Sequence, residues 1–84
     1  MMIKFYKVKD SEIRRVCEVN DAGEKVRHVA VIGTVKELLA REWILPDETE
    51  GNLEKWLVLA LRQCIAECDT LEQAKNAARS VLRW

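Results

Sequence analysis

Three cysteines and one histidine supply the residue types of a metal site. Cys64 and Cys68 are four residues apart and would share one face of a helix. Cys17 and His28 become cross-strand neighbours if residues 22 and 23 form the loop of a predicted hairpin. If the helix packed on that face of the sheet, three thiolates and one imidazole would converge, a known tetrahedral zinc set. The spacing differs from the common zinc knuckle, so the favoured interpretation is that these cysteines are small core residues.

Nucleophilic catalysis needs a thiolate or hydroxyl beside a base, and the sequence offers one such pair. Cys17 and His28 could form it as neighbours on two strands. His28 is the only histidine, and both residues fall on predicted strands rather than beside loops that could build a cleft. The sequence contains no phosphate-binding loop, dinucleotide-binding glycine motif, calcium loop or serine nucleophile motif. We therefore expect a protein that is not an enzyme and uses no cofactor.

The composition is typical of one small globular domain. The chain has 84 residues, of which 49% are hydrophobic and 33% charged, and this leaves room for a single core of modest size. The longest apolar run, residues 56–61, is six residues long, whereas a membrane-spanning helix needs about 18. Three cysteines cannot form a complete set of disulfides. We expect a cytoplasmic protein with reduced thiols and no membrane contact.

Alternating apolar residues predict three strands, over residues 2–8, 13–19 and 24–32. Two short connections between them indicate an antiparallel meander. The register of the second hairpin is open between two alternatives. A type I turn with a left-handed Gly23 places Asn20 opposite Glu24.

The other register has a two-residue loop and places Asp21 opposite Glu24, which sets like charges against each other. It is favoured because burial of one face normally decides register, and it gathers the apolar residues of the hairpin. In this register one face holds Ile13, Cys17, Val19, Val26, His28, Ala30 and Ile32, together with Arg15.

Three helices are predicted in the remainder of the chain, over about residues 35–43, 53–67 and 71–83. Thr34 and Asn52 are the expected N-caps of the first two, and Asp69-Thr70-Leu71-Glu72 has the spacing of a capping box for the third. The middle helix is predicted from an apolar stripe at helical spacing. That stripe holds Leu53, Trp56, Leu57, Ala60, Leu61, Cys64, Ile65 and Cys68.

The predicted fold class is therefore α+β with the order βββααα: a three-stranded antiparallel meander followed by three helices packed on one face. We expect a single compact domain of residues 1–84, with the sheet in 1–33 and the helical part in 34–84. The sheet face that carries Cys17 and His28 is expected to form the core beneath the helices. The opposite face is expected to be the outer one.

With catalysis set aside, the predicted function is protein binding. Inhibitors of host machinery encoded by phages and mobile elements, anti-CRISPR proteins among them, have this size and lack catalytic motifs. We expect the chain to act in that manner, by binding and blocking a protein partner, and a homodimer is a further expectation. The expected contact residues are the outer sheet face, two tryptophans and an acidic loop: Arg14, Glu18, Lys25, Arg27, Trp43, Asp47, Glu48, Glu50 and Trp84.

Nucleic-acid binding is the alternative function. The 14 basic residues equal the 14 acidic ones, so the chain lacks the overall positive charge that supplies most of the affinity for nucleic acid. Positive charge is nevertheless concentrated on the predicted strands, where Arg14, Lys25 and Arg27 could contact phosphates. The small zinc protein with Cys17, His28, Cys64 and Cys68 as ligands is the second alternative.

Overall fold

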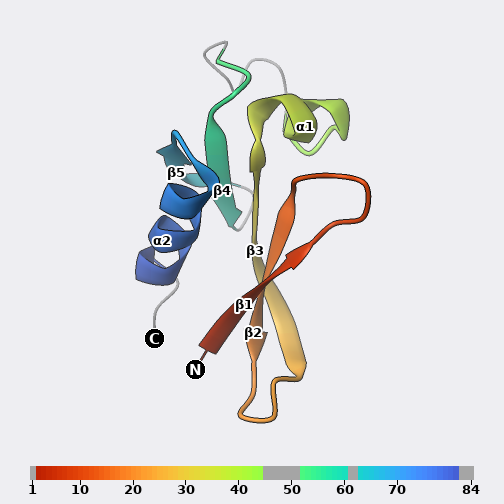
Figure 1. Cartoon of the computed structure of the whole chain (residues 1–84), viewed down its shortest axis with the longest axis vertical. Coiled ribbons are helices and arrows are strands. Elements are labelled where there is room, and N and C mark those ends of the chain that lie inside the picture. The colour runs from red at the N-terminus through yellow and green to blue at the C-terminus, as the bar shows by residue number, and fades with distance from the viewer. Residues whose placement is uncertain (1, 45–51, 61–62, 82–84) are drawn as a thin grey trace.

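Five strands form one antiparallel sheet, and each strand lies beside the next one along the chain (Figure 1). The computed structural model describes residues 2–44, 52–60 and 63–81. Within this part, one helix follows the third strand and a second helix follows the fifth. The elements in chain order are β1 (Met2–Lys7), β2 (Arg14–Val19), β3 (Lys25–Thr34), α1 (Val35–Ala40), β4 (Trp56–Ala60), β5 (Gln63–Cys68) and α2 (Leu71–Val81).

The predicted fold class, three strands followed by three helices, is wrong. The first three strands lie close to their predicted positions, but the segment predicted as the middle helix contains β4 and β5. Val58 of β4 packs in one apolar cluster, while its neighbour Leu57 packs in another. A strand that is covered on both faces is apolar at every position. Such a run also includes apolar residues at helical spacing, so it can be mistaken for the buried face of a helix. The predicted helical part, 34–84, therefore contributes two strands to the sheet.

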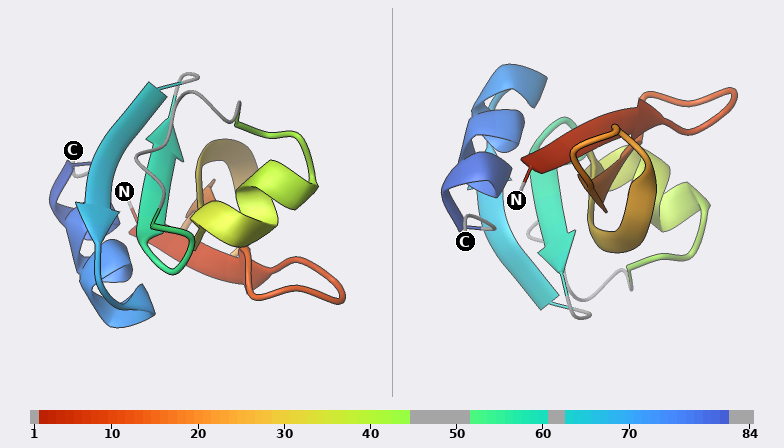
Figure 2. Two further views of the ribbon diagram at one scale, coloured as in Figure 1. Left: turned by 90° about the horizontal axis from the view of Figure 1, so that it is seen from above. Right: turned by 90° about the horizontal axis from the view of Figure 1, so that it is seen from below.

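The two helices lie on opposite sides of β4 (Figure 2). We call the side beneath α2 the α2 face; its buried cluster holds Val16, Ala30, Ile32 and Val58 of the sheet with Ala74 and Ala78 of α2. The other side is the α1 face, where α1 packs near one end of the sheet. Its buried cluster holds Ile13, Val35, Leu38, Ile44 and Leu57.

The hairpin of β2 and β3 has one predicted register at its turn and the other farther along the strands. At the turn, the backbone N–H of Asn20 donates to the Glu24 carbonyl at 3.0 Å, and Gly23 has a φ of 81°. This is the type I turn with a left-handed glycine. Two bulges on β3 then change the register. Beyond the first bulge Glu18 pairs with Arg27 and Cys17 with His28; beyond the second, Val16 pairs with Ala30.

α1 begins at the predicted cap. Thr34 Oγ1 accepts a hydrogen bond from the Glu37 backbone N–H at 3.3 Å. The helix ends earlier than predicted because Glu42 is left-handed, with a φ of 59°, and the Trp43 N–H donates to the Leu38 carbonyl at 2.9 Å. The left-handed Glu42 and the hydrogen bond from Trp43 to Leu38 are the features of a Schellman motif. It fixes the direction in which Trp43 leaves the helix.

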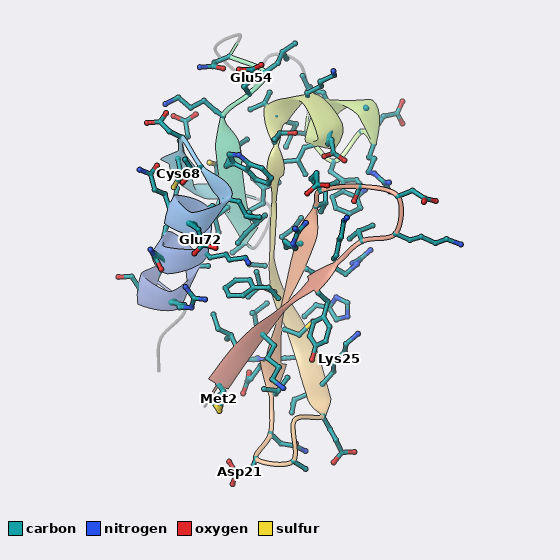
Figure 3. All side chains as sticks on the ribbon, viewed as in Figure 1. Met2, Asp21, Lys25, Glu54, Cys68 and Glu72 are labelled. Carbon is teal, nitrogen blue, oxygen red and sulfur yellow. The ribbon has the colours of Figure 1, made fainter. Side chains whose placement is uncertain are left out.

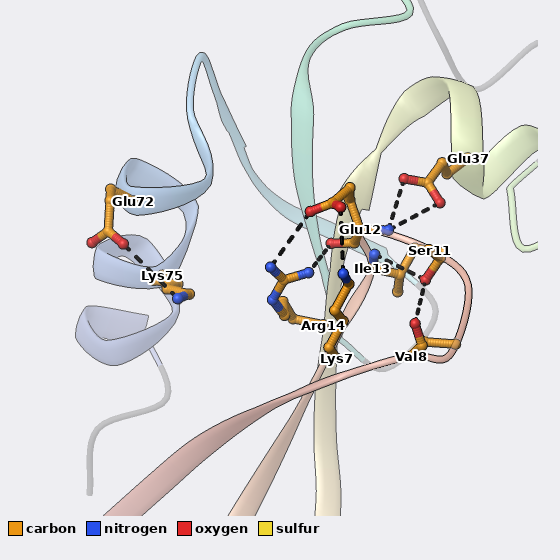
Figure 4. A network of polar contacts seen from close by, with 9 residues as sticks. All are labelled: Lys7, Val8, Ser11, Glu12, Ile13, Arg14, Glu37, Glu72 and Lys75. Atoms are coloured by element: carbon orange, nitrogen blue, oxygen red, sulfur yellow. Dashed lines mark hydrogen bonds and ion pairs between the residues drawn. The ribbon is translucent and has the colours of Figure 1, made fainter.

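A polar network joins the β1–β2 loop to α1 (Figure 4). The Glu37 carboxylate accepts from the Glu12 backbone N–H at 3.1 and 3.3 Å. Ser11 Oγ donates to the Val8 carbonyl at 2.9 Å and accepts from the Ile13 N–H at 3.1 Å. The Glu37 carboxylate thus accepts a hydrogen bond from the β1–β2 loop instead of capping its own helix. This anchors α1 to the end of the sheet.

α2 begins at Leu71, as predicted, but its cap is Thr70 rather than Asp69, the first residue of the predicted capping box. Thr70 Oγ1 accepts from the Gln73 N–H at 3.2 Å, and Gln73 Oε1 accepts from the Asp69 N–H at 2.9 Å. The residues that pack on the sheet, Ala74 and Ala78, are small and let the helix approach closely. No helix within the described ranges combines the length and apolarity required to cross a membrane.

Candidate functional site

A shallow groove of about 280 Å³ opens beside the end of β4, lined by residues of the α1 face together with Ala30 and Ala60, which also pack beneath α2. We call it the Trp43 groove. Its floor is a row of side chains across three neighbouring strands, because Arg15 of β2 pairs with Val31 of β3, and Val31 pairs with Leu59 of β4. Its lining is Arg15, His28, Val29, Ala30, Val31, Trp43, Leu59 and Ala60.

An arginine and a tryptophan form one wall of this groove. The Arg15 guanidinium carbon lies 5.5 Å from the centre of the Trp43 ring, within the range of a cation–π contact. Trp43 remains 37% exposed, since the turn after α1 holds it at the rim. Arg15 is half-buried. The pair therefore presents a cation and an aromatic ring to the same opening.

Among the residues that the structure describes, the groove lining is cationic and includes no acid. Its ionisable lining residues are Arg15 and the exposed His28. Arg14 and Arg27 on neighbouring positions each pair with a glutamate. Arg15 forms no ion pair with any residue in the described part of the chain. Its charge is therefore available to an anionic group that enters the groove.

The predicted zinc set does not converge. Cys17 is buried and pairs with His28, as the favoured register predicted. Cys64 and Cys68 lie on β5, a strand rather than a helix, and β4 separates β5 from β3. Residues 2–44, 52–60 and 63–81 contain no cluster of three or more potential metal-binding side chains. The interpretation that all three cysteines are core residues holds for Cys17 and in part for Cys68, which is half-buried and packs against the cluster beneath α2, but it is wrong for Cys64, which is exposed.

The predicted outer cluster is divided between two faces. Glu18 and Arg27 lie on the α2 face, where Arg27 Nε donates to Glu18 Oε2 at 2.7 Å. Lys25 lies on the α1 face, with its ammonium 4.1 Å from the Tyr6 ring centre (Figure 3). The bulge between Lys25 and Arg27 places these two residues on opposite faces of the sheet.

The predicted assignment of core and outer faces is wrong for the face that α2 covers, although Cys17 and Val19 of the predicted core face are buried. α2 covers the face that carries Val16 and Glu18, and not the face that carries Cys17 and His28. Arg14 shares the α2 face and pairs with Glu12 at 3.6 Å. Of the other predicted contact residues, Trp43 borders the groove, whereas Asp47, Glu48, Glu50 and Trp84 lie outside the described residues.

Sequence reasoning missed Arg15 as a candidate site residue. It was assigned to the face of Cys17, Val19 and Ile32, where it was the one charged member. A charged residue on an otherwise apolar strand face is a signal of function or of a specific partner, because burial of an unpaired charge is costly. Trp43, which contacts it, is 28 positions away and on another element, so no local pattern could join the two.

The Glu18–Arg27 pair is asymmetric, and its two members should respond differently to mutation. The Glu18 side chain is 4% exposed and that of Arg27 61%. Arg27→Ala leaves a buried carboxylate without this partner and should lower the free energy of unfolding by about 1–3 kcal/mol. Glu18→Gln keeps an acceptor beside a solvated guanidinium and should cost less, about 1 kcal/mol.

Urea unfolding followed by circular dichroism measures both changes. Lys7→Ala is the control, because Lys7 and Glu12 form an exposed ion pair whose loss should cost under about 0.5 kcal/mol. Equal losses in the Arg27 and Glu18 variants would contradict the asymmetric burial.

Cys64 should react slowly with alkylating reagents even though it is exposed. Partial burial raises the pKa of the Cys64 thiol above its usual value, and only the thiolate is nucleophilic. At pH 8 we expect iodoacetamide to modify Cys64 more slowly in the folded protein than in urea. In the folded chain the Cys64 thiol stays protonated to a higher pH than in urea. The difference between the folded and unfolded alkylation rates should therefore shrink as the pH rises through the raised pKa. Peptide mass spectrometry measures each rate, and a folded rate equal to the unfolded rate at pH 8 would refute the shift.

Comparison with known proteins gives no family assignment. No family model, no curated protein and no solved structure matches this chain.

Proposed function

We propose that this chain is a non-enzymatic interaction module that binds, and so blocks, a surface of a partner protein through the Trp43 groove. The observation that carries the proposal is the cation–π pair of Arg15 and Trp43 beside an apolar floor. Tryptophan and arginine are the residue types most enriched among the side chains that dominate binding energy at protein interfaces.

The openness of the groove, rather than its volume, favours a protein partner over a small molecule. Pockets that enclose cofactors or drug-sized ligands hold about 300–1,000 Å³ and bury most of the ligand. The Trp43 groove holds about 280 Å³ and is open to solvent along its length. A space of this kind suits one or two side chains that project from a larger surface.

The charges of the sheet give less support to nucleic-acid binding. Arg14 and Arg27 pair with Glu12 and Glu18, and Lys25 lies on the opposite face from Arg27. Affinity for nucleic acid grows with the number of phosphates neutralised together. The arginines and lysine that would contact phosphates are thus divided and partly neutralised.

Quantitative affinity capture tests the proposal. Immobilised protein is exposed to a lysate, and stoichiometric partners are measured by mass spectrometry. Trp43→Ala should reduce recovery of such a partner about tenfold or more, the effect expected for an interface anchor. Val81→Ala is the matched control, because Val81 is 54% exposed on α2, away from the groove. Unchanged recovery with Trp43→Ala, or an equal loss with Val81→Ala, would place the binding surface elsewhere.

A further inference from the structure

We infer that the partner element taken by the Trp43 groove is a short, acidic, extended peptide segment. This inference rests on the proposed function and adds the chemistry of the ligand. The segment would place one carboxylate beside Arg15 and an apolar side chain on the floor formed by Val31 and Leu59.

The first argument is charge complementarity. The described lining of the groove includes Arg15 and His28 and no carboxylate. The Arg15 guanidinium carbon lies 5.5 Å from the centre of the Trp43 ring, and this cation–π contact restrains the side chain before a carboxylate binds. Hydrogen bonds between a guanidinium and a carboxylate are shorter and about twice as strong as neutral ones. A carboxylate is therefore the group that this groove should recognise best.

The second argument comes from the edge of β3 beside the groove. β4 pairs with residues 31–34 of β3 only, whereas β2 pairs along residues 25–32. The part of β3 that includes Val26 and Val29 therefore has no neighbouring strand on the β4 side among the described residues. Val26 is 54% exposed there. An extended peptide could continue the line of β4 and pair with this edge.

The two bulges limit how long that peptide can be. They fall between the pairs Val19/Lys25 and Glu18/Arg27, and between Cys17/His28 and Val16/Ala30. Each bulge interrupts regular pairing and twists the strand. A long added strand is therefore disfavoured, and specificity must come from the side chains that enter the groove.

A titration monitored by NMR tests the inference on the full chain labelled with isotope. The probes are three capped octapeptides and an octathymidylate; each peptide has Ser at the even positions and, at the odd positions, Leu alternating with Glu, with Gln or with Lys, so that both kinds of side chain share one face of the extended peptide. The Glu/Leu peptide should shift the Trp43 indole N–H and the amides of Arg15 and His28, with a Kd no weaker than about 5 mM. The Gln/Leu peptide should bind at least about fivefold more weakly, because it lacks the charge.

Two variants assign the charge recognition to its residue. Arg15→Gln should reduce the affinity for Glu/Leu to that for Gln/Leu. Arg79→Gln is the matched control, since it makes the same charge change on an exposed position of α2 and should leave binding unchanged. The dispersion of the amide spectrum reports whether each variant is folded, and the peptide comparison on the unmodified protein does not depend on either variant.

Four results would overturn the inference. Equal binding of Glu/Leu and Gln/Leu would show an apolar groove without acidic preference, and the proposed function would stand. Equal or tighter binding of Lys/Leu would reverse the expected charge. Stronger shifts of the groove residues by octathymidylate would favour nucleic acid instead. No groove shift with any peptide would exclude the acidic segment, and the capture experiment with Trp43→Ala would then decide the proposed function separately.

Discussion

Val58→Asp is expected to lower the free energy of unfolding by about 3–5 kcal/mol, the cost of an uncompensated buried charge. Val58 is fully buried. It pairs with Ile32 on β3 and Ala66 on β5 and lies in the cluster beneath α2. A domain of this size has a total stability of about 4–12 kcal/mol, so a large part of the variant should be unfolded without denaturant. Urea titration followed by far-ultraviolet circular dichroism measures the change.

Cys64→Asp is the matched control for this prediction. Cys64 is exposed on β5, so the same carboxylate should cost under about 1 kcal/mol there. If residues 53–67 formed a helix, Cys64 would lie on its apolar stripe and Val58 outside it. Cys64→Asp would then cost more stability than Val58→Asp. A greater loss for Cys64→Asp than for Val58→Asp would therefore restore the helix and contradict the hairpin.

Leu38→Ala is expected to cost about 2–5 kcal/mol, the range for truncation of a fully buried leucine. Leu38 has no exposed surface and joins α1 to the sheet through the cluster that contains Ile13 and Leu57. It also packs closely on the β3 backbone: a Cβ at Gly33 would lie 3.1 Å from Leu38 Cδ2. Gly33 is held in the sheet by its pairing with Leu57. The β3 backbone therefore cannot move in to fill the cavity left by Leu38→Ala.

Leu53→Ala provides the comparison for Leu38→Ala. The side chain of Leu53 is 46% exposed, and the same truncation there should cost under about 1 kcal/mol. Both variants are measured by thermal and urea unfolding. Similar losses at the two positions would contradict the placement of Leu38 at the centre of the α1 cluster.

The elements with strong local signals were predictable from the sequence. Three strands, the Thr34 cap and a last helix follow from alternation, capping residues and spacing that act over a few positions. The hairpin register was not decided by such signals. The turn at Gly23 and the burial of one face favoured different registers, and the chain satisfies both by inserting bulges in β3.

The β4–β5 hairpin could not be distinguished from a helix by periodicity. The run Trp56 to Ala60 is apolar at every position and fits a strand buried on both faces as well as a buried helix. Asn52, predicted as a helix cap, accepts from the Glu54 N–H at 3.1 Å in a turn before β4. The short length of the run was the signal that favoured a strand.

The candidate site depended on contacts that span the chain. Trp43 was predicted as a contact residue from its type, but its position beside Arg15 arises from the Schellman turn after α1 and the pairing of three strands. Arg27 and Lys25 were predicted to share one face, but a bulge places them on opposite faces. Neither the bulges nor the long-range contact has a local sequence pattern.

Both proposals require β4 to lie beside β3, because Val31 and Leu59 form the floor of the Trp43 groove. Nuclear Overhauser contacts in the NMR spectrum of the full chain measure this arrangement directly. We predict cross-strand contacts between the backbone protons of Val31 and Leu59, and between those of Val58 and Ala66. Absence of both, with contacts between residues three apart along 56–67, would show a helix in this segment and contradict the groove.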